Sequence, residues 1–84
     1  AVGKHEDSPA VLKALEAITL MSQGQVVAFD FPITGLLQQA YAAMNGFAGL
    51  LRDTARERFG LSIQTVTDDK DPTKLVLLAR KRPA

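Results

Sequence analysis

The sequence has no cysteine and a single histidine among its 84 residues. Without cysteine, disulfide bonds, thiolate catalysis and cysteine-ligated metal sites are all excluded. The one histidine, His5, lies in an expected flexible tail over residues 1–8, where nothing would orient it as a general base. Long apolar runs are also missing, so the sequence predicts no membrane-spanning segment. By default, we expect an intracellular protein.

Neither positive nor negative charge is in clear excess. Ten Lys and Arg face nine Asp and Glu, for a formal net charge of +1. Any attraction for phosphate must therefore come from local clusters, which argues against tight nonspecific coating of DNA. With 46% hydrophobic and 23% charged residues, the composition is typical of a globular protein, and the length allows one domain, which we expect over residues 9–83.

Two periodic segments open this domain. Ser8 before Pro9 is typical of a helix start, because the serine oxygen caps the first turn and proline suits the first helical position. From Pro9 to about Ser22, apolar residues at intervals of three or four predict a helix with one buried face: Val11, Ala14, Leu15, Ile18 and Met21. Gly24 reverses the chain, and Gln25 to Phe31 alternates as a strand with one apolar face: Val27, Phe29 and Phe31.

A longer helical pattern covers residues 33–59 and ends at Gly60. Its apolar stripe follows the helical period: Leu37, Tyr41, Met44, Ala48, Leu51, Ala55 and Phe59. Gly46 and Gly49 each cost about 1 kcal/mol relative to alanine inside a helix, and asparagine is a good cap for a new one. We therefore expect a break or kink at Asn45–Gly46.

Two β-rich segments follow, Leu61–Thr67 and Lys74–Arg80, with a polar turn between them. The order is helix, strand, one or two helices, strand, strand. We predict an α+β fold: a two-layer sandwich in which a three-stranded sheet carries two or three helices on one face.

Residues suited to catalysis are scarce. No serine has a predictable basic partner, so no activated nucleophile is visible. Asp68, Asp69 and Asp71 lack the glycine and the downstream glutamate of a calcium loop, and we interpret them as a solubilising turn. Asp30 has no second acid nearby in sequence. We expect no enzyme, no metal and no cofactor.

Cations cluster in the second half of the chain. One row along the long helix has spacings of four, three and four, about a quarter turn from the apolar stripe: Asn45, Gly49, Arg52 and Arg56. Gly49 leaves backbone open to close approach, and guanidinium groups are forked phosphate donors. The last strand adds Arg80, Lys81 and Arg82. We predict that this set binds single-stranded nucleic acid; the alternative is surface charge balanced by acids such as Asp53 and Glu57.

The layout over residues 9 to 83 resembles the Arg-x-x-x-His domain, a module that binds single-stranded nucleic acids. The likeness includes Phe29-Asp30-Phe31-Pro32 at the first strand, Gly60-Leu61 before the second and Lys81-Arg82-Pro83 at the end. It implies binding of RNA or single-stranded DNA. The motif that names the family is absent: the nearest pair is Arg52 and Arg56, and Gly49 and Asp53 stand near the expected positions.

Other families share parts of this pattern. Gly46-Phe47-Ala48-Gly49, between two expected helices, resembles the backbone-clamping Gly-x-x-Gly loop of KH domains, but it has no Lys or Arg. With the long helix split, the order also resembles a winged helix in which residues 45–59 form the recognition helix and residues 68–73 an acidic wing. Sulfur-carrier proteins of bacterial thiouridine synthesis have a similar layout, with a reactive cysteine where Ser8 stands here.

A protein-interaction or dimerisation module of a larger assembly is the alternative outside nucleic acids. Several apolar residues are expected on the sheet face opposite the helices, where a partner or a second copy would cover them: Val26, Ala28, Val66, Val76 and Leu78.

Overall fold

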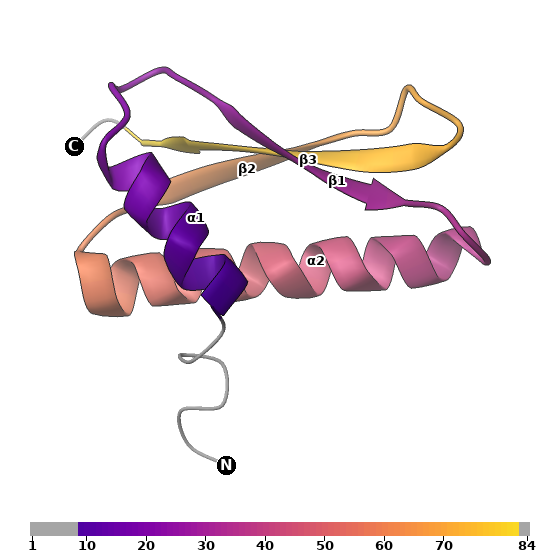
Figure 1. Ribbon diagram of the computed structural model, residues 1–84, viewed down its shortest axis with the longest axis horizontal. Coiled ribbons are helices and arrows are strands. Elements are labelled where there is room, and N and C mark those ends of the chain that lie inside the picture. The colour runs from indigo at the N-terminus through magenta and orange to yellow at the C-terminus, as the bar shows by residue number, and fades with distance from the viewer. Residues whose placement is uncertain (1–8, 83–84) are drawn as a thin grey trace, which may run out of the picture.

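The computed structural model describes residues 9–82. Its elements are α1 (Pro9–Thr19), β1 (Val27–Pro32), α2 (Leu37–Thr54), a π-helical turn η1 (Ala55–Phe59), β2 (Ile63–Asp68) and β3 (Lys74–Lys81) (Figure 1). The predicted α+β order is confirmed, although α1 ends at Thr19 rather than Ser22. The tail, with His5 and the capping role given to Ser8, lies outside the described residues. No helix in the described part of the chain is long and apolar enough to cross a bilayer.

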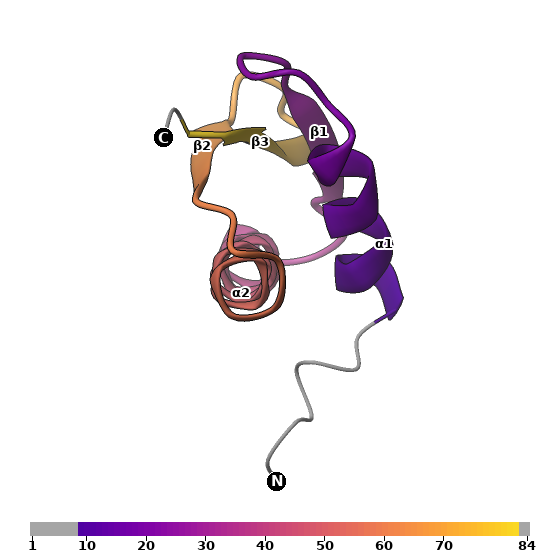
Figure 2. The ribbon, with the colours of Figure 1, turned by 90° about the vertical axis from the view of Figure 1, so that its left-hand side faces the viewer.

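The three strands lie in the order β1-β3-β2, and β3 is antiparallel to both of its neighbours. β1 and β2 are therefore parallel to each other, and the connection between them runs through α2, as parallel strands require a crossover. Seen end-on, α1 and α2 lie on the same side of the sheet and leave its other side bare (Figure 2). This is the predicted two-layer arrangement.

Alternation along the strands decides which side chains meet the helices. In β3, Leu75, Leu77 and Ala79 are buried, while the residues between them are more exposed. β1 alternates as predicted, with Val27, Phe29 and Phe31 half-buried and the residues after each of them exposed. Each strand thus has one helix-facing side and one outer side, as the pleat dictates.

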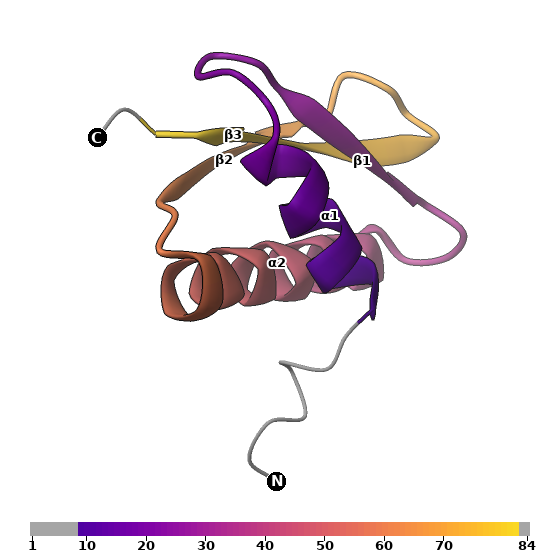
Figure 3. The ribbon, with the colours of Figure 1, turned by 60° about the vertical axis from the view of Figure 1, so that its left-hand side comes forward.

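The core lies between the helices and this inner face. Around α1 it consists of Val11, Leu15, Ile18, Leu51, Ala55, Ile63 and Ala79; under the first half of α2 it consists of Ala40, Met44, Ala48, Leu75 and Leu77. α1 packs against the C-terminal half of α2, and the two helices cross at an angle (Figure 3). Phe47 packs against both groups, with its ring centroid 5.0 Å from that of Phe29 and 5.7 Å from that of Phe31.

The break or kink expected at Asn45–Gly46 is wrong. α2 runs without interruption from Leu37 to Thr54 and is straight in Figure 1. Met44 and Leu51 are buried on either side of the glycines, and burying each such side chain contributes about 1.5–3 kcal/mol, which outweighs the glycine penalty. Residues 46–49 are accordingly helical and form no Gly-x-x-Gly loop, and α2 contains no separate recognition helix.

The end of the long helix is a wider turn. η1 continues α2 through Phe59, and the N–H of Leu61 then bonds the carbonyl oxygen of Ala55 at 3.0 Å. Gly60 has φ 64°, a left-handed conformation that favours glycine, so the predicted stop is confirmed. Turns of the π type are frequent at functional sites. Here the turn leads directly into the start of β2.

Candidate nucleic-acid interface

Arg52, Arg56 and Arg82 line one hollow together with residues 60–63. The hollow has a volume of about 330 Å³ and is called the arginine hollow below. Its three arginines come from α2, from η1 and from the residue that follows β3. Segments far apart in the sequence therefore place their cations around one concave surface at the β2 edge of the sheet.

Arg52 reaches from the last turn of α2 to the edge strand. Its Nη1 donates a hydrogen bond of 2.7 Å to Oγ1 of Thr65, which lies on the helix-facing side of β2. A guanidinium has five N–H donors, so this bond leaves most of them available while it restricts the rotamer. Arg52 is thus held in place by a neutral group, and among the described residues it forms no ion pair.

Arg56 has a weak acidic partner. Its Nη2 lies 3.3 Å from Oδ1 of Asp53, and both side chains are largely exposed, at 73% and 63%. Exposed pairs of this kind are screened by solvent and contribute little. The contact with Asp53 therefore holds Arg56 only weakly.

Arg82 is fixed through its backbone. Its N–H donates a bond of 2.9 Å to the carbonyl oxygen of Ser62, which continues the ladder between β2 and β3 beyond the strand ends. This bond brings Arg82 beside residues 60–63, opposite the end of the helix. The side chain of Arg82 is exposed.

Two other predicted cations lie elsewhere. Arg80 is on the outer side of the sheet, where its Nε and Nη2 donate bonds of 3.1 and 2.9 Å to Oε1 of Gln64. Lys81 points toward α1 and donates through Nζ to the carbonyl oxygen of Thr19 at 3.1 Å. A cation suits that position, because the last carbonyl groups of a helix carry partial negative charge. The structure thus divides the predicted basic run among three places.

Asn45 and Gly49 belong to a second hollow, of about 690 Å³, formed by side chains of α2 and η1. Its lining includes the acids Asp53 and Glu57 and, among the described residues, no Lys or Arg. The predicted row along the helix is therefore divided between two hollows: Asn45 and Gly49 lie in one beside acids, and the two arginines line the other. Only its basic part, Arg52 and Arg56, reaches the arginine hollow.

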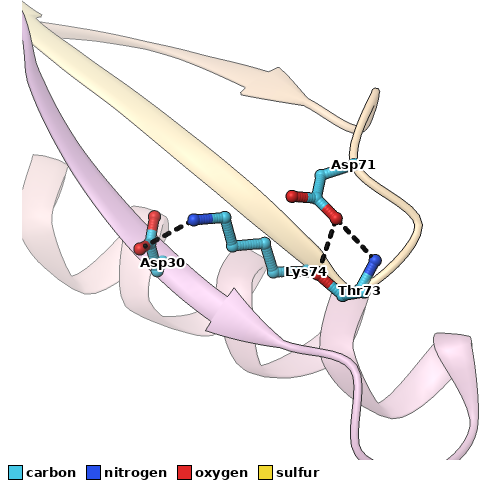
Figure 4. A network of polar contacts seen from close by, with 4 residues as sticks. All are labelled: Asp30, Asp71, Thr73 and Lys74. Carbon is cyan, nitrogen blue, oxygen red and sulfur yellow. Dashed lines mark hydrogen bonds and ion pairs between the residues drawn. The ribbon is translucent and has the colours of Figure 1, made fainter.

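The acids of the β2–β3 turn bond within the protein. Oδ1 of Asp71 accepts bonds from the Thr73 hydroxyl at 2.6 Å and the Thr73 N–H at 2.7 Å (Figure 4), and these bonds lower the pKa of Asp71. The hydroxyl of Tyr41 donates to Asp69 at 3.2 Å, which raises the pKa of Tyr41. Within residues 9–82, no three His, Asp or Glu side chains are grouped to hold a metal ion.

Sequence reasoning missed two parts of the site, the chain over residues 60–63 and the role of Thr65. The signal for the first is the glycine at the helix end, which places the following residues next to the last helical turn. Thr65 gives no signal, because its contact with Arg52 depends on how α2 lies against β2.

The chain matches no known family model, no curated protein and no solved structure.

Proposed function

We propose that this domain binds the phosphate backbone of single-stranded nucleic acid at the arginine hollow. The observation that carries the proposal is the convergence of Arg52, Arg56 and Arg82 on one concave surface. Guanidinium groups match phosphate oxygens with two parallel N–H donors, so a group of three provides a short track for a polyanion.

The charges around the hollow favour an anion. Among the described residues, no carboxylate lines it, and Arg52 is bonded to a neutral hydroxyl. Because the net charge of the whole chain is only +1, attraction has to be local. Binding is therefore expected to be weak, sensitive to salt and confined to this part of the surface.

A single strand fits better than a duplex. A broad DNA surface would also meet acids on the adjoining helix, Asp53 and Glu57. A flexible strand avoids them by following the hollow alone. Within the part of the chain that the structure describes, no aromatic side chain lines the hollow, and we therefore expect contacts to the backbone and not base stacking. The domain is accordingly expected to show little sequence preference.

The test is a titration with fluorescent oligo-dT and oligo-rU over several salt concentrations. Three phosphate contacts to a single strand predict that log K falls with log salt with a slope of about −2. Arg52→Ala, Arg56→Ala and Arg82→Ala should each weaken binding and make the slope shallower by about 0.7. These side chains are exposed, so circular dichroism should show that the variants remain folded.

Arg80→Ala is the matched control. It removes the same charge from the same basic run, but from the outer side of the sheet. Affinity and salt slope should remain those of the unmodified protein. Equal losses in Arg80→Ala and Arg52→Ala, or no binding at low salt, would overturn the assignment of the site.

A further inference from the structure

The outer side of the sheet has an uncovered apolar centre. It consists of Val26, Ala28, Val66, Val76 and Leu78, called the open face below. Val26 is 47% exposed and Val66 51% exposed, and both line a depression together with Leu78. Figure 2 shows that both helices lie on the opposite side of the sheet. Nothing described in the chain covers this surface.

Strand register orders the open face into rows. The middle row is Ala28, Leu78 and Val66; the row on one side of it pairs Arg80 with Gln64; the row on the other side is Asp30, Val76 and Asp68. The face is therefore basic at one end and apolar in the middle, and its other end carries two acids, of which Asp30 is paired with Lys74 of the next row. Successive rows are about 6.6 Å apart, since each is two residues along the strand.

This pattern is complementary to itself, and we propose that a second copy of the chain covers the open face. The two sheets pack face to face around a twofold axis that runs along the middle row, with their β3 strands antiparallel. Leu78 then meets Leu78 of the other copy. Arg80 of each copy lies over the acidic row of the other, between Asp30 and Asp68.

The charges select this arrangement over its alternative. A twofold axis parallel to the strands would place Arg80 against Arg80 and the two acidic rows against each other. Like charges brought together in an interface are strongly unfavourable. With the axis along the middle row, both ends of the interface pair opposite charges, and a symmetric dimer satisfies them twice.

The side chains are already arranged for this contact. Gln64 holds the guanidinium of Arg80 toward β2 through a neutral oxygen, and within residues 9–82 Arg80 has no carboxylate partner. Asp30 forms an ion pair with Lys74, in which Oδ2 and Nζ are 3.2 Å apart (Figure 4). Asp68 accepts a backbone bond from Lys70 but has no ion pair among the described residues. Asp68 is therefore the main acidic group available to Arg80 of a second copy.

The dimer is expected to be weak. We expect a face of three short strands to bury less than the roughly 1,200 Å² of total surface typical of stable complexes. Association should therefore appear only at high micromolar concentration and above. The dimer does not depend on nucleic-acid binding, because no residue of the arginine hollow belongs to the open face.

Analytical ultracentrifugation from about 20 μM to about 2 mM tests the dimer on the scale expected of a weak interface. The unmodified chain should shift toward the dimer mass as concentration rises. Arg80→Glu places a negative charge against the partner's acidic row, and Asp68→Lys places a positive charge against the partner's Arg80. Each variant alone should associate at least about tenfold more weakly.

An equimolar mixture of Arg80→Glu and Asp68→Lys is the decisive sample. In the mixed pair, one end keeps its native contacts and the other pairs Glu at position 80 with Lys at position 68, so association should recover. Lys13→Glu is the control, because it changes net charge as Arg80→Glu does but lies exposed on α1. A monomer at all concentrations, association unaffected by Arg80→Glu, or no recovery in the mixture overturns the proposal.

Discussion

Arg52 and Thr65 join the end of α2 to the edge strand β2 through a hydrogen bond of 2.7 Å between Nη1 and Oγ1. The bond connects the two layers of the fold at the border of the arginine hollow. It fixes a long and otherwise flexible cation before any ligand arrives, which reduces the side-chain entropy lost on binding.

Thr65→Val should therefore weaken oligonucleotide binding without changing its salt dependence. Valine keeps the shape of threonine but offers no acceptor, so Arg52 keeps its charge and loses its fixed direction. We expect a loss of about 0.5–1 kcal/mol in affinity, or roughly two- to fivefold, by oligonucleotide titration. Thr67→Val, on the same strand and the same side, should leave affinity unchanged. A shallower salt slope in Thr65→Val would show that the bond does more than orient the side chain.

Replacing the two helical glycines should stabilise the protein. A Cβ built at Gly46 or Gly49 meets no described atom within 4 Å. Gly46→Ala and Gly49→Ala should each raise the free energy of unfolding by about 0.5–1 kcal/mol, measured by urea denaturation. Gly60→Ala should instead lower it by about 1 kcal/mol, because an alanine is strained at positive φ. Destabilisation by Gly46→Ala would mean that the glycine has a packing role.

Phe47 should be among the most sensitive positions in the chain. Its ring contacts Phe29 and Phe31 and lies against both parts of the core. Phe47→Ala should lower the free energy of unfolding by about 3 kcal/mol, because it leaves a cavity where α2 meets β1. Leu20→Ala removes a side chain that is 88% exposed and should change stability by no more than about 0.5 kcal/mol. Similar effects of the two substitutions in thermal or urea unfolding would contradict this packing.

Acid stability should depend on the contact between Asp71 and Thr73. The Thr73 hydroxyl and N–H stabilise the ionised carboxylate and lower the pKa of Asp71 below its ordinary value of 3.8. As the pH falls below the ordinary pKa, Asp71 takes up a proton in the unfolded chain before it does so in the folded protein. The contact between Asp71 and Thr73 therefore stabilises the folded protein at pH values above the ordinary pKa. This stabilisation is lost as the pH falls through the lowered pKa of the folded state.

Thr73→Val removes the hydroxyl donor and should raise the pKa of Asp71 toward its ordinary value. Carboxyl carbon-13 NMR measures this pKa directly. Because the carboxylate is exposed, the accompanying change in acid stability should be small. Thr67→Val changes a residue of β2 that makes no bond to Asp71 among the described contacts, so it should leave the pKa of Asp71 unchanged. An unaltered pKa of Asp71 in Thr73→Val would show that the backbone bond alone holds the carboxylate.

Local patterns were sufficient to predict most of the fold. Val11, Leu15 and Ile18 mark the buried face of α1, and the alternation in β1 predicts its inner and outer sides. The break at Asn45–Gly46 was predicted from propensity alone. Burial of Met44 and Leu51 along the same helix outweighs that propensity, and this burial depends on contacts with distant strands.

The candidate site was less predictable. Arg80 and Arg82 are two residues apart in sequence, yet Arg80 lies over the outer side of the sheet and Arg82 lines the arginine hollow. The separation depends on where β3 ends and on the bond between Arg82 and Ser62. Neither is visible in a run of three basic residues. The apolar residues of the open face were easier to predict, because strand alternation alone assigns them to one side.

The middle position of β3 has a consequence for biosynthesis. β1 and β2 each pair with β3, which follows every other described element in the chain. On the ribosome, the two earlier strands therefore lack a hydrogen-bonding neighbour until residues 74–81 emerge. β2 can then close a local hairpin with β3, but β1 has to pair with β3 across positions as distant as Val27 and Ala79. Such long-range closure is slow compared with helix formation. A nascent chain stalled before this segment should expose two unpaired strand edges and depend on chaperones.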